Sequence, residues 1–285
     1  MLKKITGAEE IAQLLPKRKP EAHKGDFGRV LVFAGSRRYP GAAYLCAEAA
    51  VRCGSGLVTL ASDYEVLDIL SMKLNEAMVI HKSAVAVQGL IETADAIAIG
   101  CGMGRRSDTL STLEQVLNSV KETPVVIDAD GLNMLCGKLE LIKGRSNVLL
   151  TPHEGEFARL IGSDSAFISR RREALAENFV RKYGVNLLLK GKHTIVASPD
   201  EFRINPSGSS KMASGGMGDA LTGMIASFAG QGMDVYTAGY FAAFVHGYCG
   251  DEKGKTMYSV TAGEVIRELP YALQRLAEKN KKNFI

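Results

Sequence analysis

The stretch Asn205–Gly223, NPSGSSKMASGGMGDALTG, decides how this chain is expected to fold. Its glycines let successive backbone N–H groups turn toward one point, and a helix N-terminus that follows them adds partial positive charge there. Apolar residues then recur at helical spacing from Ala220 to Phe228, which predicts a buried helix near Gly218–Ala229. A loop that opens into a helix in this way is suited to holding an anion.

Asp219 lies in the first turn of that expected helix. A carboxylate beside an anion-binding loop suits phosphoryl transfer, because it can take the proton of the attacking hydroxyl. The helix dipole favours the carboxylate and thereby weakens Asp219 as a base, so we expect it to orient the hydroxyl while proton transfer comes late. The alternative is that Asp219 only caps the helix and the glycines only form a turn.

Outward from this stretch, short apolar segments alternate with longer helical patterns. This alternation predicts an α/β fold, with a mainly parallel central sheet and helices on both faces. The expected strands are Val30–Ala34, Leu57–Ala61, Ala96–Ile99, Val125–Asp128, Val148–Thr151, Asn186–Lys190, Thr194–Ala197 and Glu201–Asn205. The further expected helices lie near Ala42–Cys53, Tyr64–Leu70, Ser107–Val120, Glu154–Ile161, Ser165–Tyr183, Met233–Gly250 and Ala262–Glu278.

The last three expected strands are separated by short gaps, which predicts an antiparallel meander on the late edge of the sheet. Several strands run directly into small, acidic or basic residues. Ligands of α/β sheets bind beyond the carboxyl ends of the strands, so we expect these residues to converge on one rim.

Composition limits the classes of protein that this chain can belong to. Its 285 residues, 46% of them hydrophobic, fit one large domain, 1–285, with residues 1–22 as an N-terminal extension. The net charge of +4 suits anionic small molecules such as nucleotides. Basic residues gather near both ends without interleaved aromatic residues, so we expect solvated termini and no nucleic-acid partner.

No apolar run is long enough to span a bilayer, and the first residues do not resemble a signal peptide, so we expect no membrane association. Thr6 and Glu9 have the spacing of a capping box for a short helix ending at Pro16. The five cysteines show no Cys-x-x-Cys spacing and lie among apolar residues. We therefore expect reduced thiols in a cytoplasmic protein.

Common nucleotide and metal signatures are missing from the sequence. Gly100, Gly102 and Gly104 are too closely spaced for the dinucleotide fingerprint G-x-G-x-x-G, although their loop can still let a ligand approach the backbone. The chain contains no P-loop and no nucleophile-elbow pattern. It also has no paired Cys and His spacing for zinc.

Three further segments admit both a structural and a functional reading. His153, in the turn Thr151–Glu156, is either a satisfied polar residue or a substrate contact. The segment Lys190–Thr194 is either a surface hairpin with solvated lysines or a clamp for nucleotide phosphates. Asp128 and Asp130 either face Mg²⁺ or cap a helix that follows Gly131.

Several motifs together resemble a known family. They are His23-Lys24-Gly25-x-x-Gly28-x-Val30-Leu31-Val32, Gly35-Ser36, Tyr39-x-Gly41-Ala42-Ala43, Asp128-x-Asp130-Gly131-Leu132-Asn133, Thr151-Pro152-His153-x-Gly155-Glu156, Lys190-Gly191-x-x-Thr194 and Gly215-Gly216-x-Gly218-Asp219-x-Leu221. In this order they are similar to the ADP/ATP-dependent NAD(P)H-hydrate dehydratases, which have a ribokinase-like fold of three α/β/α layers. The resemblance runs from about His23 to about Gly263.

The resemblance implies a repair reaction on hydrated NADH or NADPH, whose nicotinamide ring has taken up water. Phosphorylation of the 6-hydroxyl by ADP or ATP creates a leaving group, and loss of phosphate restores the reduced ring. By the same resemblance, Asp219 is the base and the glycines bind the transferred phosphoryl group. The residues implied are Asp219, Gly216 and Gly218 for catalysis, Lys190, Gly191, Lys192, His193, Thr194 and Gly218 for the nucleotide, and Ala42, Gly104, His153 and Asp219 for the hydrated dinucleotide.

The resemblance also implies Mg²⁺ at the phosphates, with Asp128 as a candidate ligand, and a homo-oligomer such as a tetramer. Many members carry a fused epimerase domain, so here we expect a separate epimerase as functional partner. Ser209-Ser210-Lys211 replaces the Asn and Gly associated with this loop, and Lys211 contacts phosphate or points to solvent. Two alternatives remain: a ribokinase-like kinase of a small alcohol (a sugar, thiazole or pyrimidine), and a non-enzymatic nucleotide sensor.

Overall fold

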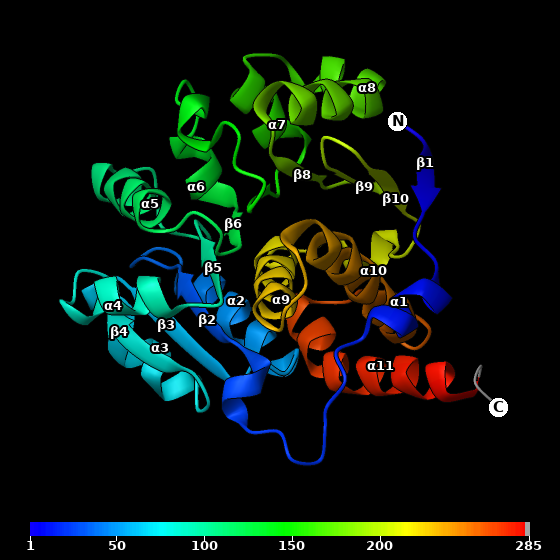
Figure 1. Cartoon of the computed structure of the whole chain (residues 1–285), viewed down its shortest axis with the longest axis horizontal. Helices are drawn as coiled ribbons and strands as arrows, with labels where there is room; N and C mark the ends of the chain where they lie inside the picture. Colours follow the sequence, from blue (N-terminus) through cyan, green and yellow to red (C-terminus); the bar gives the residue numbers. More distant parts are fainter. Residues whose placement is uncertain (283–285) are drawn as a thin grey trace.

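The computed structural model describes residues 1–282, and its ten strands form one sheet that runs through the centre of the molecule (Figure 1). The strand order is β1-β10-β9-β8-β7-β6-β5-β2-β3-β4. The strands are β1 (Lys3–Ile5), β2 (Arg29–Phe33), β3 (Leu57–Ser62), β4 (Met78–His81), β5 (Ala96–Ile99), β6 (Val125–Ile127), β7 (Val148–Leu150), β8 (Asn186–Leu189), β9 (Thr194–Ala197) and β10 (Phe202–Asn205).

Helices cover both faces of the sheet, as the sequence pattern predicted. They are α1 (Ala8–Leu14), α2 (Pro40–Arg52), α3 (Leu67–Lys73), α4 (Ala86–Thr93), α5 (Ser107–Ser119), α6 (Ala129–Met134), α7 (Glu154–Ile161), α8 (Ser165–Tyr183), α9 (Met217–Gly230), α10 (Val235–Gly254) and α11 (Ala262–Lys282). Short 3-10 helices occur at Lys24–Phe27, Tyr64–Val66, Leu139–Ile142 and Ser210–Met212.

The direction of the strands sets the position of any ligand site. Every neighbouring pair is parallel except those formed by β9, which is antiparallel to both β8 and β10. The chain order reverses between β2 and β5, because β3 and β4 lie on one side of β2 while β6 and β7 lie beyond β5. Parallel sheets bind ligands at the carboxyl edge beside such a reversal.

Two hydrophobic cores hold the helices to the sheet. Residues of α1, α2, α9, α10 and α11 pack on one face, and the largest fully buried side chains there include Phe228 and Phe241. Residues of α4, α5, α7 and α8 pack on the other face around Phe33 and Phe157. The apolar residues of α10 belong to the first core. The molecule therefore has the three layers expected.

The structure corrects several expectations about local structure. The Thr6–Glu9 capping box is wrong, because Gly7 is the N-cap of α1, no side chain caps that helix, and the buried Thr6 hydroxyl lacks a partner among the described residues. The sequence also did not predict β1, β4 or α4. The antiparallel meander exists, but β1 pairs with β10, so the meander is not the edge of the sheet.

Three polar residues that were expected inside strands lie one residue past them. The strands β6, β7 and β8 end at Ile127, Leu150 and Leu189, so Asp128, Thr151 and Lys190 begin the loops at the carboxyl edge. None of the helices in this described part of the chain is long and apolar enough to cross a membrane. All five cysteines are free thiols, as expected.

Candidate active site

Asp128 joins three elements at the carboxyl edge of the sheet. The residue is 1% exposed, and one carboxylate oxygen accepts hydrogen bonds of 2.8 Å from both Ala129 N and Lys190 Nζ. The other oxygen accepts a 2.7 Å hydrogen bond from Thr222 Oγ1 of α9. Asp128 is therefore the N-cap of α6, which begins directly at Ala129 and not after Gly131 as expected.

These bonds bear on the expected Mg²⁺ site. Both oxygens of Asp128 already have donors, and Asp130 accepts a 2.7 Å hydrogen bond from Gly104 N. Within residues 1–282 there is no group of three or more His, Cys, Asp or Glu side chains arranged to hold a metal ion. The described side chains therefore do not fit a magnesium site made by the protein alone.

The glycine-rich loop opens α9 in the expected way. Gly216 is the N-cap with φ of +87°, a conformation that favours glycine, and a Cβ there would lie 2.4 Å from Leu45 Cδ1. A Cβ on Gly218 would lie 3.1 Å from Lys190 Nζ. The ammonium group of Lys190 therefore lies beside the first turn of α9, where an anion would be held by both.

Asp219 is half-buried in that first turn. Burial raises its pKa to about 6, and the negative charge of Asp128 acts in the same direction, while a hydrogen bond with Cys101 and the charge of Lys190 oppose the rise. This direction is opposite to the one expected from the helix dipole, because desolvation of the carboxylate raises its pKa toward the pH at which a general base works best.

Lys190–His193 forms the turn between β8 and β9, and Thr194 begins β9, so the hairpin was predicted correctly. Lys190 is not a solvated surface lysine, since its side chain is only 20% exposed and pairs with Asp128. Burial works against its charge, but Asp128 and Glu156 outweigh burial and raise the pKa of Lys190. The ammonium group is therefore a fixed positive charge in the site.

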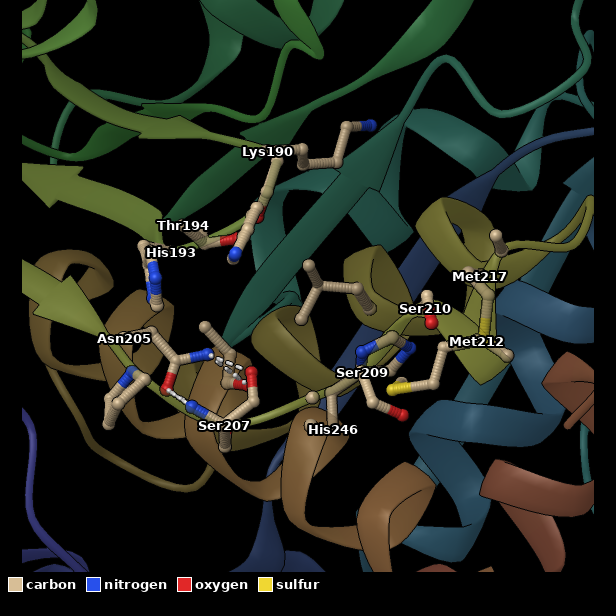
Figure 2. A pocket seen from close by; sticks show the side chains of 18 of the residues that line it. Lys190, His193, Thr194, Asn205, Ser207, Ser209, Ser210, Met212, Met217 and His246 are labelled. Atoms are coloured by element: carbon tan, nitrogen blue, oxygen red, sulfur yellow. Dashed lines mark hydrogen bonds between the residues drawn. The ribbon is translucent and has the colours of Figure 1, made fainter. Parts of the chain in front are cut away.

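The residues of this turn line a cavity of about 660 Å³ (Figure 2). The side chains of His193 and Asn205 lie at one end of the view and that of Met217 at the other, with His246 between them. The cavity is lined by Lys190, Gly191, Lys192, His193, Thr194, Asn205, Pro206, Ser207, Gly208, Ser209, Ser210, Met212, Ala213, Met217, Gly218, Leu221, Ala243, His246 and Gly247. Its size and mainly apolar lining suit an organic ligand with a few polar contacts.

Ala42, Gly104 and His153, three of the four residues implied for the hydrated dinucleotide, do not line this cavity, and neither does the fourth, Asp219. Ala42 is in the first turn of α2, and Gly102, in the loop after β5, packs against its Cβ. Gly104 is in the same loop, and its amide donates to Asp130. His153 is the N-cap of α7, and its Nδ1 accepts from the amides of Gly155 and Glu156, so its ring also has a structural role.

His153 and Lys190 form an isolated parallel bridge, and Lys190 N donates a 2.8 Å hydrogen bond to Pro152 O. This contact connects the two halves of the candidate site. Lys190 lines the cavity and is also bridged to His153. The charges of Lys190, Asp128 and Glu156 all act on the pKa of Asp219. The residues named from the sequence for catalysis therefore gather at the start of α9.

The ammonium group of Lys211 does not point free into solvent, which was one of the two expected alternatives. Its Nζ donates a 2.5 Å hydrogen bond to Gly254 O at the end of α10. A cation at a helix C-terminus satisfies an unpaired carbonyl and complements the dipole. Lys211 therefore anchors the loop before α9.

Sequence reasoning missed four residues at the site: Cys101, Arg172, Thr222 and His246. The Cys101 thiol forms a hydrogen bond with Asp219. Thr222 follows Asp219 by three residues, so helical spacing alone could have placed it on the same side of α9. His246 lines the cavity, and burial lowers its pKa to about 4, although its hydrogen bond with Met217 opposes that change. No local pattern could have indicated Arg172.

The fold places the chain in a class that also contains solved ribokinase-like proteins. The structure is also similar to that of the ADP/ATP-dependent NAD(P)H-hydrate dehydratase from Bacillus subtilis, which was co-crystallised with ATP and Mg²⁺. That protein is 28% identical, with a TM-score of 0.81 over 95% of this chain and 98% of the other.

The family model of the NAD(P)H-hydrate dehydratases matches residues 30–271, and the chain belongs to this family. It is 34% identical to the ADP-dependent (S)-NAD(P)H-hydrate dehydratase of Listeria monocytogenes, over 98% of this chain and 99% of that protein. It is 39% identical to the bifunctional NAD(P)H-hydrate repair enzyme of Moorella thermoacetica, over 93% of this chain and 53% of that enzyme. The chain thus spans about half the length of the bifunctional relatives.

Proposed function

We propose that this chain is a hydro-lyase that uses ADP or ATP to dehydrate the S-form of hydrated NADH or NADPH. The observation that carries the proposal is the convergence at the start of α9, where Lys190 Nζ lies beside Gly218 and the pKa of Asp219 is about 6. An anion loop, a fixed cation and a basic carboxylate together suit phosphoryl transfer to a hydroxyl. Membership of the dehydratase family supports the same conclusion.

In the proposed reaction Asp219 accepts the proton of the 6-hydroxyl while the oxygen of that hydroxyl attacks the terminal phosphorus of the nucleotide. The bond between that phosphorus and its bridging oxygen breaks, and AMP leaves if ADP is the donor. Amides near Gly216 and Gly218, together with Lys190, stabilise the charge on the transferred group. The ring nitrogen then expels phosphate, and loss of the neighbouring ring proton restores the reduced nicotinamide.

We assign the cavity beside Lys190–Thr194 to the nucleotide, and Ala42, Gly104 and His153 to the hydrated dinucleotide. Mg²⁺, when bound, would neutralise the phosphates. In this chain the nucleotide phosphates would have to provide most of its ligands, since both carboxylate oxygens of Asp128 already accept hydrogen bonds. A separate epimerase that interconverts the two hydrate forms would supply the S-form to this enzyme.

The direct test measures the absorbance of reduced nicotinamide after purified protein is mixed with hydrated NADH, Mg²⁺ and either ADP or ATP. We expect a nucleotide-dependent rise, with AMP or ADP and phosphate as the other products. A stable phosphorylated product without recovery of NADH would instead identify a kinase of an alcohol. No turnover with either donor, from a folded protein that binds nucleotide, would contradict the proposal.

Asp219→Ala tests the role of the base in the same assay. We expect turnover to fall by on the order of 10²–10⁴-fold, which is the usual contribution of a general base. Asp219→Asn is the matched variant, because it keeps the shape of the side chain and should keep nucleotide binding. A fall in turnover of less than about threefold would remove Asp219 from this role.

A further inference from the structure

The backbone of the turn between β8 and β9 has an unusual conformation. His193 has a φ of +57° although it is not glycine, and Gly191 has a φ of +154°. A non-glycine residue in such a conformation persists only where its surroundings hold it, and such residues occur often at ligand sites. Within residues 1–282, the amides of Gly191, Lys192 and His193 have no hydrogen-bond acceptor. Three neighbouring unpaired amides beside the cavity can receive an anion.

One side chain holds the carbonyl groups of this turn. The guanidinium group of Arg172 donates to Lys192 O at 2.7 Å, to Leu189 O at 3.1 Å and to Lys190 O at 3.4 Å. A Cβ on Gly191 would lie 2.7 Å from Arg172 Nη2, so the guanidinium packs directly against the turn. Arginine is suited to this role because its donors form a rigid planar fork that lysine lacks.

Two observations show how Arg172 is fixed in place. The helix α8 contains one residue with non-helical angles, Arg171 at φ −138° and ψ 25°, directly before Arg172. In addition, Arg172 Nε lies 3.1 Å from Oε1 of Glu154, and Ser169 donates to the other oxygen of that carboxylate. Glu154 is the first residue of α7 and follows His153. Arg172 therefore links the turn beside the cavity to the segment that carries His153.

We propose that Arg172 is a positioning residue: it holds the carbonyls of the β8–β9 turn so that its amides face the phosphates of the nucleotide. The inference rests on the proposed assignment of the cavity to ADP or ATP. It goes further because it predicts which part of the nucleotide depends on Arg172. Replacing Arg172 should weaken the binding of the phosphate groups, whereas the binding of the adenosine part should be unchanged.

The test measures the affinity of the full-length protein for ADP and for adenosine by calorimetry. For Arg172→Met we expect ADP affinity to fall by on the order of tenfold, as for lost hydrogen bonds with a charged partner, while adenosine affinity stays the same. The ADP affinity of Arg172→Lys should fall nearly as far, because lysine keeps the charge without the planar fork of donors. Added guanidinium ion should restore part of the ADP affinity of Arg172→Met.

Arg170→Met is the matched control, since Arg170 is exposed on the same helix and should leave both affinities unchanged. Equal losses of ADP and adenosine affinity in Arg172→Lys would show a merely structural role and overturn the inference, as would no loss at all. If Arg172→Met does not fold, Arg172→Lys still decides the question. Failure of the wild-type dehydratase assay would overturn the proposed function while leaving this binding result intact.

Discussion

Asp219 shows at the scale of one residue how burial sets chemistry. Its pKa of about 6, raised by burial and by Asp128, means that the carboxylate needed for proton transfer forms only as the pH rises through that value. We therefore expect kcat/KM to increase with pH up to about 6 and then to level off. A rate profile that is flat or falling across this range would contradict Asp219 as the base. The residual activity of Asp219→Asn should not show this titration.

The same shift predicts an effect on stability. Because the pKa of Asp219 is higher in the folded protein than in the unfolded chain, the folded state binds more protons between about pH 4 and 6, and stability falls as the pH rises through this window. Asp219→Asn should therefore raise the free energy of unfolding by about 1–2 kcal/mol at neutral pH, after allowance for partial exposure. Urea unfolding of both proteins measures the difference, which should vanish below about pH 4.

At the scale of elements, one ion pair joins β6, β8 and α9. Lys190→Met would leave the Asp128 carboxylate, which is 1% exposed, without a cation while Thr222 still donates to it. We expect the free energy of unfolding to fall by about 3 kcal/mol, because a buried charge loses its partner. The double variant Lys190→Met, Asp128→Asn should recover most of that loss. Equal stability of the single variant and wild type would show that water replaces the lysine.

The elements around the site were largely predictable, whereas the contacts between them were not. Local pattern was enough to place the loop before α9, the β8–β9 hairpin and the polar residues at the strand ends. The pairing of Asp128 with Lys190 joins residues 62 positions apart, so no local signal indicates it. Arg172 was missed for the same reason, since its role depends on a break in α8 and on carbonyls of another element.

At the scale of the whole molecule, the first residues are part of the architecture and not an appendage to it. From the sequence we expected residues 1–22 to be an N-terminal extension with a solvated end. In the structure, β1 extends the sheet beside β10. Short exposed strands such as β1 carry little periodic signal, so their existence depends on the partner strand. Glu10 of α1 also pairs with Arg203 of β10 at 2.8 Å.

Ile11 of α1 tests whether this segment contributes to the stability of the whole chain. Its side chain is fully buried in the same core as Ala220 and Met224 of α9, the helix that begins at the candidate site. Ile11→Ala should lower the free energy of unfolding by about 2–5 kcal/mol, because it removes buried methyl groups and leaves a cavity. Gln13→Ala, on the exposed side of α1, is the control and should change stability by less than about 0.5 kcal/mol. Thermal and urea unfolding measure both. Since Ile11 lies outside the cavity and away from the strand ends, the ADP affinity of Ile11→Ala should be unchanged well below its melting temperature. A loss of ADP affinity at that temperature would show that the core behind α9 controls the geometry of the site.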